Sequence, residues 1–326
     1  MDNFLNHLQF DGASHPTFRH SVTDRPTHAA NLRGIVSLLI AMALFIGSDT
    51  VVKLAGATTP VTEIMAVRGL MAAVLMGVVV VATVDVNRWN LMLRPMVALR
   101  ATIEAVIATF FLISLPHLAL GDITVIMQVT PFVLTVLSAM VLREAVGWRR
   151  WAAVAVGFVG VVLVAQPSAQ GVNIYVVSAL IVAVLVAVRD IVTRRLDSSI
   201  PTAAVTFATT MSVCLLGFAG APLESWTPLS NDTLLLLAAS AVLVSGANIF
   251  IIRAFRGVDV SVVSPFRYAA VVWAVLFGFL VWGDVPDPLA VVGTLIIVAS
   301  GLYAMHRETR HLRRPEVAEV LPDPHA

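Results

Sequence analysis

The sequence predicts an all-α, polytopic membrane protein with ten transmembrane helices arranged as two inverted five-helix repeats. Three observations lead to this prediction: the composition, the length of the apolar runs and an internal repetition. Of the 326 residues, 58% are hydrophobic and only 13% are charged, whereas soluble domains carry about 25% charged residues. This balance, with a mean hydropathy of +0.90, excludes soluble enzymes, nucleic-acid-binding proteins and disordered proteins.

Ten apolar runs are long enough to cross a bilayer. A helix rises 1.5 Å per residue, so about 30 Å of hydrocarbon requires about 20 residues. The runs are continuously apolar, which favours helices over the alternating ten-residue strands of a membrane barrel. The predicted spans are 34–54, 61–84, 96–116, 120–142, 151–166, 173–193, 202–221, 233–252, 259–282 and 288–305.

The placement of basic residues predicts the orientation of these spans. Of 21 Lys and Arg residues, sixteen fall in the tails and connections on one side, and the other five lie within spans. The connections on the opposite side, 55–60, 117–119, 167–172, 222–232 and 283–287, contain none. Basic residues concentrate in cytoplasmic loops, so we expect a cell inner membrane protein whose tails, 1–32 and 306–326, both lie in the cytoplasm. The first tail lacks the layout of a signal peptide.

The chain repeats itself with a period of about 140 residues. Asp49, Lys53 and Pro60 recur as Asp190, Arg194 and Pro201, each at an offset of 141 residues. This divides the chain into five-span halves, 33–167 and 172–305. Five is an odd number, so the halves enter the membrane from opposite sides. Inverted repeats are typical of secondary transporters, although gene duplication has also produced channels.

The layout and several segments resemble the drug/metabolite transporter superfamily, in its ten-span EamA-type branch. The segments are Met127 to Phe132, Leu142 to Glu144, Gly147 to Trp151, Gly157 to Val161, Ser264 to Tyr268, Trp282 to Asp284 and Gly293 to Gly301. Arg143 stands where the family usually has glycine, and Asp284 where it has glutamate. The resemblance implies export of amino acids or metabolites, or import of compounds such as riboflavin or S-adenosylmethionine.

Polar residues within the spans are candidates for a substrate cavity between the halves. Arg267 lies eight positions beyond Asp259, about 12 Å deep in the ninth span. Insertion there costs about 2.5–3.5 kcal/mol, so its side chain needs a partner, water or a ligand. Guanidinium groups bind carboxylates through paired hydrogen bonds, which favours an anionic substrate. The expected cavity residues are Arg68, Glu104, Gln128, Asn248, Arg267 and Tyr268.

For each candidate a structural alternative stays open. Arg68 and Arg267 are either substrate or gating residues or members of static buried pairs, and Glu104 is placed to pair with Arg100 at i,i+4. The prolines of the fourth and ninth spans, Pro131 and Pro265, predict kinks that are either hinges or static.

Two pairs, Asp49 with Lys53 and Asp190 with Arg194, stand near opposite ends of equivalent spans. Each pair is either a self-neutralised i,i+4 ion pair or one of two gates that close opposite sides. Proton coupling through Asp49, Glu63 or Glu104 is a further option, because buried carboxylates can titrate near neutrality.

Motifs of catalysis, nucleotide binding and metal ligation are missing from the sequence. We therefore expect a protein that is not an enzyme and has no cofactor or metal, whose partners are a small organic metabolite and the lipid bilayer. The predicted function is secondary active transport by alternating access, proton-coupled or as an exchanger. The alternatives are import of a vitamin or nucleoside-like cofactor and, more remotely, a channel or a membrane-embedded enzyme. The oligomeric state is left open.

Overall fold

The computed structural model describes residues 28–84, 90–91, 93–141, 147–166, 173–197, 199–255, 258 and 260–312, and these are helical apart from turns and connections. The elements are α1 (His28–Ala55), α2 (Val61–Thr83), α3 (Pro95–Ser114), α4 (Leu120–Met127), α5 (Thr130–Val141), α6 (Trp148–Ala165), α7 (Ile174–Arg194), α8 (Thr202–Gly220), η2 (Ala221–Leu223), α9 (Asn231–Phe255), α10 (Val260–Val263), η3 (Ser264–Tyr268), α11 (Ala269–Trp282) and α12 (Pro288–Leu312).

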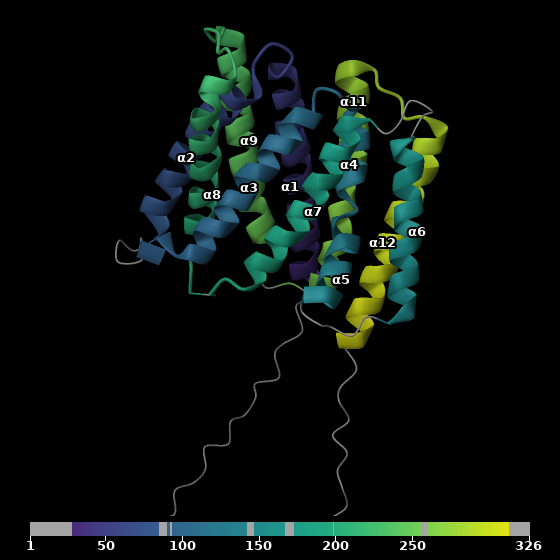
Figure 1. Ribbon diagram of the computed structural model, residues 1–326. Helices are drawn as coiled ribbons and strands as arrows, with labels where there is room; N and C mark the ends of the chain where they lie inside the picture. Colours follow the sequence, from purple (N-terminus) through teal and green to yellow (C-terminus); the bar gives the residue numbers. More distant parts are fainter. Residues whose placement is uncertain are drawn as a thin grey trace, which may run out of the picture.

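The helices form one bundle in which successive spans run in opposite directions (Figure 1). The end where α1 begins and α12 ends, at the bottom of Figure 1, is called the terminal face, and the opposite end the distal face. Among the described residues, eight helical segments have the length and apolar composition of a membrane span. The fifth and tenth predicted spans correspond to shorter apolar helices, Trp151–Ala165 and Pro288–Ala304. The structure thus confirms the predicted all-α membrane architecture.

The packing joins helices from the two parts of the chain. Helix α1 packs on α9, α2 on α8, α3 on α7 and α6 on α12, and Figure 1 shows α6 beside α12 at one edge of the bundle. Small residues allow the closest approaches. A Cβ on Gly293 of α12 would lie 2.6 Å from the carbonyl oxygen of Gly160 on α6, and a Cβ on Gly217 of α8 would overlap the backbone of Ala66 on α2.

The fourth and ninth spans are interrupted rather than continuous. The fourth divides into α4 and α5 at Gln128 and Val129, and the ninth passes through the 3-10 segment η3 between α10 and α11. Pro131 has no N–H for the carbonyl of Met127, and the hydroxyl of Thr130 donates to that oxygen instead, at 2.7 Å. Pro265 occupies the first turn of η3. At both prolines the α-helix is therefore interrupted, where the sequence predicts a kink.

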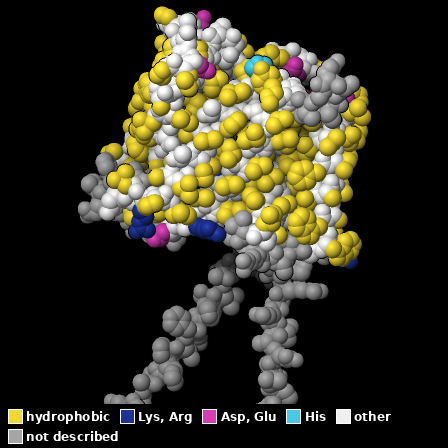
Figure 2. Space-filling view, in the orientation of Figure 1, with side chains coloured by type: hydrophobic (Ala, Val, Ile, Leu, Met, Phe, Trp, Pro, Cys, Tyr) yellow, Lys and Arg dark blue, Asp and Glu magenta, His cyan; other side chains and the backbone are white. Residues whose placement is uncertain are grey.

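Apolar side chains cover the side of the bundle shown in Figure 2, while Lys and Arg lie at its lower edge. Large apolar side chains are exposed on several helices, including Val78 of α2 (65%), Leu280 of α11 (66%) and Leu295 of α12 (63%). Soluble monomers rarely expose such continuous apolar surface. The belt between the two faces is what a hydrocarbon environment requires.

Candidate functional site

Two polar side chains, those of Gln128 and Arg267, lie at the interruptions of the fourth and ninth spans. Gln128 follows the last turn of α4, and its Nε2 is buried without a hydrogen-bond partner among the described residues. A buried amide donor normally has a partner. Gln128 and Pro265 are 137 residues apart, an offset close to that of the sequence repeat, so the two interruptions fall at matching positions of the halves.

Arg267 is the cation of the second interruption. Helix α1 packs against η3, and Arg267 lies within electrostatic range of Asp190 and Arg189 on α7. Its side chain is exposed. The accessible guanidinium therefore lies near the charges of α7. Arg267 forms no hydrogen bond or ion pair with the residues that the structure describes.

Tyr268, the neighbour of Arg267, is directed elsewhere. Its hydroxyl lies against Gly301 of α12, and a Cβ on that glycine would overlap the phenol oxygen. Asn248 on α9, also predicted to line the cavity, donates through Nδ2 to the carbonyl of Val244 one turn earlier in its own helix, at 2.8 Å. In the described contacts, Tyr268 therefore packs against α12, and Asn248 forms a hydrogen bond within α9.

Charged residues of α3 and α7 form what we call the terminal cluster: Arg100, Glu104, Arg189 and Asp190. Arg189 is its centre. Its Nη1 donates to Glu104 Oε2 at 3.0 Å and to Oε1 at 3.2 Å, and its Nη2 and Nε donate to Asp190 Oδ1 at 2.7 and 3.1 Å. One guanidinium therefore satisfies both carboxylates. The sequence analysis did not single out Arg189. Ion pairs between charged residues of different predicted spans would have indicated it as a partner of Glu104.

The expected pair of Arg100 with Glu104 is only loose. Arg100 Nη2 lies 4.0 Å from Glu104 Oε2. The stronger bonds of Arg100 run to hydroxyls, from Nε to Thr193 Oγ1 at 3.1 Å and from Nη1 to Thr209 Oγ1 at 2.7 Å. Asp190 is paired with Arg189, and the side chain of Arg194 lies outside the described residues.

A second set of residues, the distal cluster, lies nearer the other face: Ser48, Asp49, Arg68 and Ser240. The hydroxyls of Ser48 and Ser240 are 2.8 Å apart, and Arg68 Nη2 donates to Ser48 Oγ at 3.0 Å. Asp49 supplies the compensating charge near Arg68. Arg68 Nε is buried without a partner among the described residues. Ser48 and Ser240 are fully buried, whereas Asp49 and Arg68 are half-buried.

The two clusters occupy matching positions of the repeat. Ser48 matches Arg189, Asp49 matches Asp190 and Arg68 matches Thr209, each at an offset of 141 residues, while Arg100 matches Ser240 at 140. Equivalent positions of the two halves therefore form the distal cluster, in which two serine hydroxyls meet, and the terminal cluster, which is built on ion pairs. The 141-residue offset was visible in the sequence and could have indicated Ser48 and Arg189.

Lys53 lies in the last turn of α1 at the distal face, where it contacts other segments instead of Asp49. Its Nζ donates to the carbonyl of Leu118 at 2.6 Å and lies 4.8 Å from the centroid of the Trp282 ring. Asp122 and Asp284 lie within electrostatic range. We call Lys53, Asp122, Trp282 and Asp284 the distal seal. Gly283, at φ +72°, ends α11 in the left-handed region and turns the chain into Asp284.

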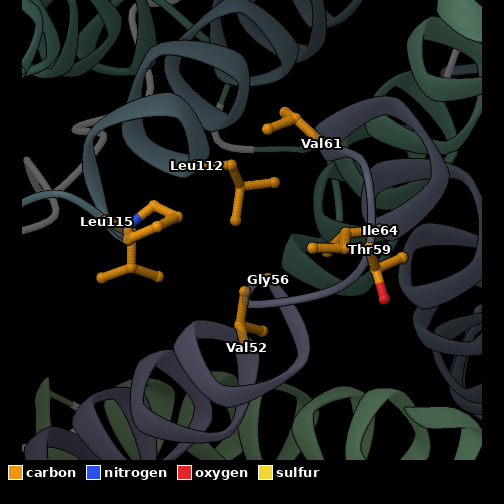
Figure 3. A pocket seen from close by; sticks show the side chains of 8 residues that line it. Val52, Gly56, Thr59, Val61, Ile64, Leu112 and Leu115 are labelled. Atoms are coloured by element: carbon orange, nitrogen blue, oxygen red, sulfur yellow. The ribbon is translucent and has the colours of Figure 1, made fainter. Parts of the chain in front are cut away.

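A separate cavity of about 20 Å³ lies between the ends of α1 and α3 and the start of α2 (Figure 3). Its lining is apolar except for Thr59, and it comprises Val52, Gly56, Thr59, Val61, Ile64, Leu112, Leu115 and Pro116. That volume holds about one water molecule, so this cavity is too small for a metabolite. Across the described residues, no group of three or more His, Cys, Asp and Glu side chains is arranged to hold a metal ion.

Comparison with known proteins identifies the family. The model of the EamA-like transporter family matches the chain twice, over residues 32–166 and 173–305. The chain belongs to the EamA-like transporter family. It is therefore a small-molecule transporter, as the sequence predicted.

Relatives with named functions include exporters and importers. The pseudopaline exporter of Pseudomonas aeruginosa is 26% identical over 277 residues, 82% of this chain and 94% of the relative. The S-adenosylmethionine uptake transporter of Rickettsia conorii is 25% identical over 59% of this chain and 65% of its own length. The riboflavin transporter of Vibrio cholerae is 29% identical over 58% and 63%.

The crystal structure of another protein has a TM-score of 0.56 and 18% identity to this chain. It covers 88% of this chain, and 99% of its own length is matched. At this identity the likeness concerns the fold alone.

Proposed function

We propose that this EamA-family protein is a secondary active transporter that moves a small organic metabolite across the inner membrane by alternating access. The observation that carries the proposal is Arg267. It is an exposed arginine in an interrupted span whose η3 segment packs on α1, it lies within electrostatic range of the charges of α7, and it bonds none of the described residues. A charge at this depth is costly unless it meets water or a ligand, and transporters place substrate sites at interrupted helices.

The proposed substrate pathway runs between the halves 33–167 and 172–305. The contacts between helices support this division, because α1 on α9 corresponds to α7 on α3 when the halves are exchanged. Likewise α2 on α8 and α6 on α12 pair equivalent helices. Arg68, Glu104 and Gln128 stay as proposed cavity residues beside Arg267. The contacts of Asn248 and Tyr268 described above favour them less.

The gates are proposed to lie at the two faces. Lys53, with the distal seal, would close the distal side, and Asp190, within the terminal cluster, the other side. Asp49 would act through Arg68 beneath the seal, and Arg194 is proposed only by its match to Lys53. The basic residues at the terminal face (Figure 2) support a cytoplasmic location for that face.

Counterflow in liposomes tests the proposal. Vesicles containing the purified full chain are preloaded with one unlabelled compound and diluted into its labelled form, across a panel of amino acids, flavins, S-adenosylmethionine and organic acids. A carrier accumulates the label transiently above equilibrium. Equilibration without this overshoot would indicate a channel, and conversion of the compound would indicate an enzyme. No movement of any compound contradicts the proposal.

Import is the second candidate, because the named relatives include uptake transporters for S-adenosylmethionine and riboflavin. Cells that express the chain separate the two directions. An exporter lowers the internal concentration of its substrate and an importer raises it. Repeating the measurement with a proton uncoupler distinguishes proton coupling from exchange.

A further inference from the structure

The charges around Arg267 do not cancel. Among the described residues, the terminal cluster and Arg267 together contain three guanidinium groups and two carboxylates. Arg189 bonds both carboxylates. Arg100 is held by two threonine hydroxyls and lies only loosely near Glu104. Arg267 is therefore the surplus positive charge of this region.

The geometry of Arg267 suits a ligand rather than a protein partner. The guanidinium has five N–H donors in a planar fork, and none donates to a described residue. Its side chain is exposed and lies near the charges of α7. A carboxylate matches the fork with two parallel hydrogen bonds and supplies one negative charge.

The neighbouring acids limit how much negative charge the site accepts. Asp190 lies within electrostatic range of Arg267, and Glu104 shares Arg189 with it. A dianion such as a phosphate monoester would bring a second negative charge toward both carboxylates. The cation that lies within electrostatic range of Arg267, Arg189, already bonds both of them. A single carboxylate balances the surplus and adds no repulsion.

We propose that the transported metabolite carries a single carboxylate group that is bound by the guanidinium of Arg267, and that uncharged amides and phosphate monoesters are discriminated against. This inference rests on the proposed transport function and names the substrate class of the same site.

Matched compounds test the inference on the detergent-purified full chain by its melting temperature. The panel consists of monocarboxylates, each with its amide, such as N-acetyltryptophan with N-acetyltryptophanamide and benzoate with benzamide; phenyl phosphate represents the dianions. The expected result is stabilisation by carboxylates, with the apparent Kd weakened about tenfold or more in Arg267→Gln. Arg94→Gln removes an exposed arginine at the start of α3 and should leave binding unchanged.

Phenylglyoxal, which modifies accessible arginines, gives a second readout that does not depend on folding of a variant. Mass spectrometry of the wild-type chain should find Arg267 modified in the absence of ligand and protected by a stabilising carboxylate. Exposed Arg94 should be modified in both conditions.

The outcomes separate the two proposals. Counterflow of some compound, together with equal binding of amides and carboxylates or an Arg267 that no carboxylate protects, overturns the carboxylate inference and leaves transport standing. Stabilisation by phenyl phosphate but not by benzoate overturns it as well. Failure of counterflow with every compound contradicts the transport function itself.

Discussion

Replacing Lys53 with methionine should open the distal face. Methionine keeps most of the apolar stem but removes the ammonium, and with it the hydrogen bond to Leu118 O (2.6 Å) and the contact with the Trp282 ring (4.8 Å). Hydrogen bonds to charged groups contribute about 1.5–3 kcal/mol, and cation–π contacts about 0.5–1 kcal/mol at exposed sites. Because Lys53 is only partly buried, we take the lower range, about 2 kcal/mol in total.

That energy predicts a measurable shift of population. At about 1.4 kcal/mol per tenfold change, the ratio of distally open to distally closed molecules rises about 30-fold, provided that the contacts exist only in the closed state. Ser240, on α9, is fully buried where it meets Ser48 of α1 beneath the seal. A cysteine at Ser240 should therefore react with an external, membrane-impermeant maleimide only in the open state.

The assay uses a chain in which Cys214, the single native cysteine, is replaced by alanine. The alkylation rate of Ser240→Cys is compared with Lys53 intact, as Lys53→Met and as Lys53→Arg, which keeps the charge. Faster labelling in Lys53→Met, with Lys53→Arg near the parent rate, is the expected result. Equal rates in all three chains, at unchanged melting temperatures, would refute a sealing role for Lys53.

Three further predictions concern the scaffold and the charges. Arg189→Gln leaves Glu104 without its main partner and should lower the free energy of unfolding by about 2–4 kcal/mol, less than the loss of a fully buried pair, because the groups are partly exposed. Chemical unfolding measures this difference, and Arg189→Lys should recover part of the lost stability. Gly293→Leu should lower the melting temperature, since a Cβ would lie 2.6 Å from Gly160 O and overpacking costs about 1–3 kcal/mol; an unchanged temperature argues against close contact. The hydrogen bond from the Ser199 backbone N–H, with further bonds from side chains, lowers the pKa of exposed Asp197. The small contribution of Asp197 to stability is therefore present above the ordinary aspartate pKa and is lost as pH falls through the lowered value. Asp197→Asn should remove this loss of melting temperature at acid pH, and an unaltered pH profile of melting would contradict the prediction.

The interruptions show where local sequence rules suffice. Pro131 and Pro265 predict kinks by removing backbone donors, and the structure interrupts both spans close to these prolines. The same rules do not say which polar atom then satisfies the freed carbonyl. Thr130 does so in α5 because its hydroxyl comes within 2.7 Å of Met127 O.

Charge pairing was predicted less well, for a physical reason. Spacing of i,i+4 suggests Asp49 with Lys53, since neighbours on one helix are near in any fold. The structure directs Lys53 to Leu118, 65 residues away, and Asp49 toward Arg68. Long side chains in a bundle choose among several helices, and the crossing of those helices decides which carboxylate or carbonyl comes within reach.

The sequence by itself determined the membrane environment, the helical class, the family and the two-fold repetition of the chain. These follow from composition, from run lengths and from residue spacing, which are properties of the chain before it folds. Only the tertiary structure decided that Arg189 satisfies both carboxylates of the terminal cluster, that Tyr268 turns to Gly301, and that Arg267 bonds none of the described residues. Each of these depends on which side chains of different helices meet, and that is fixed by packing between segments far apart in the chain.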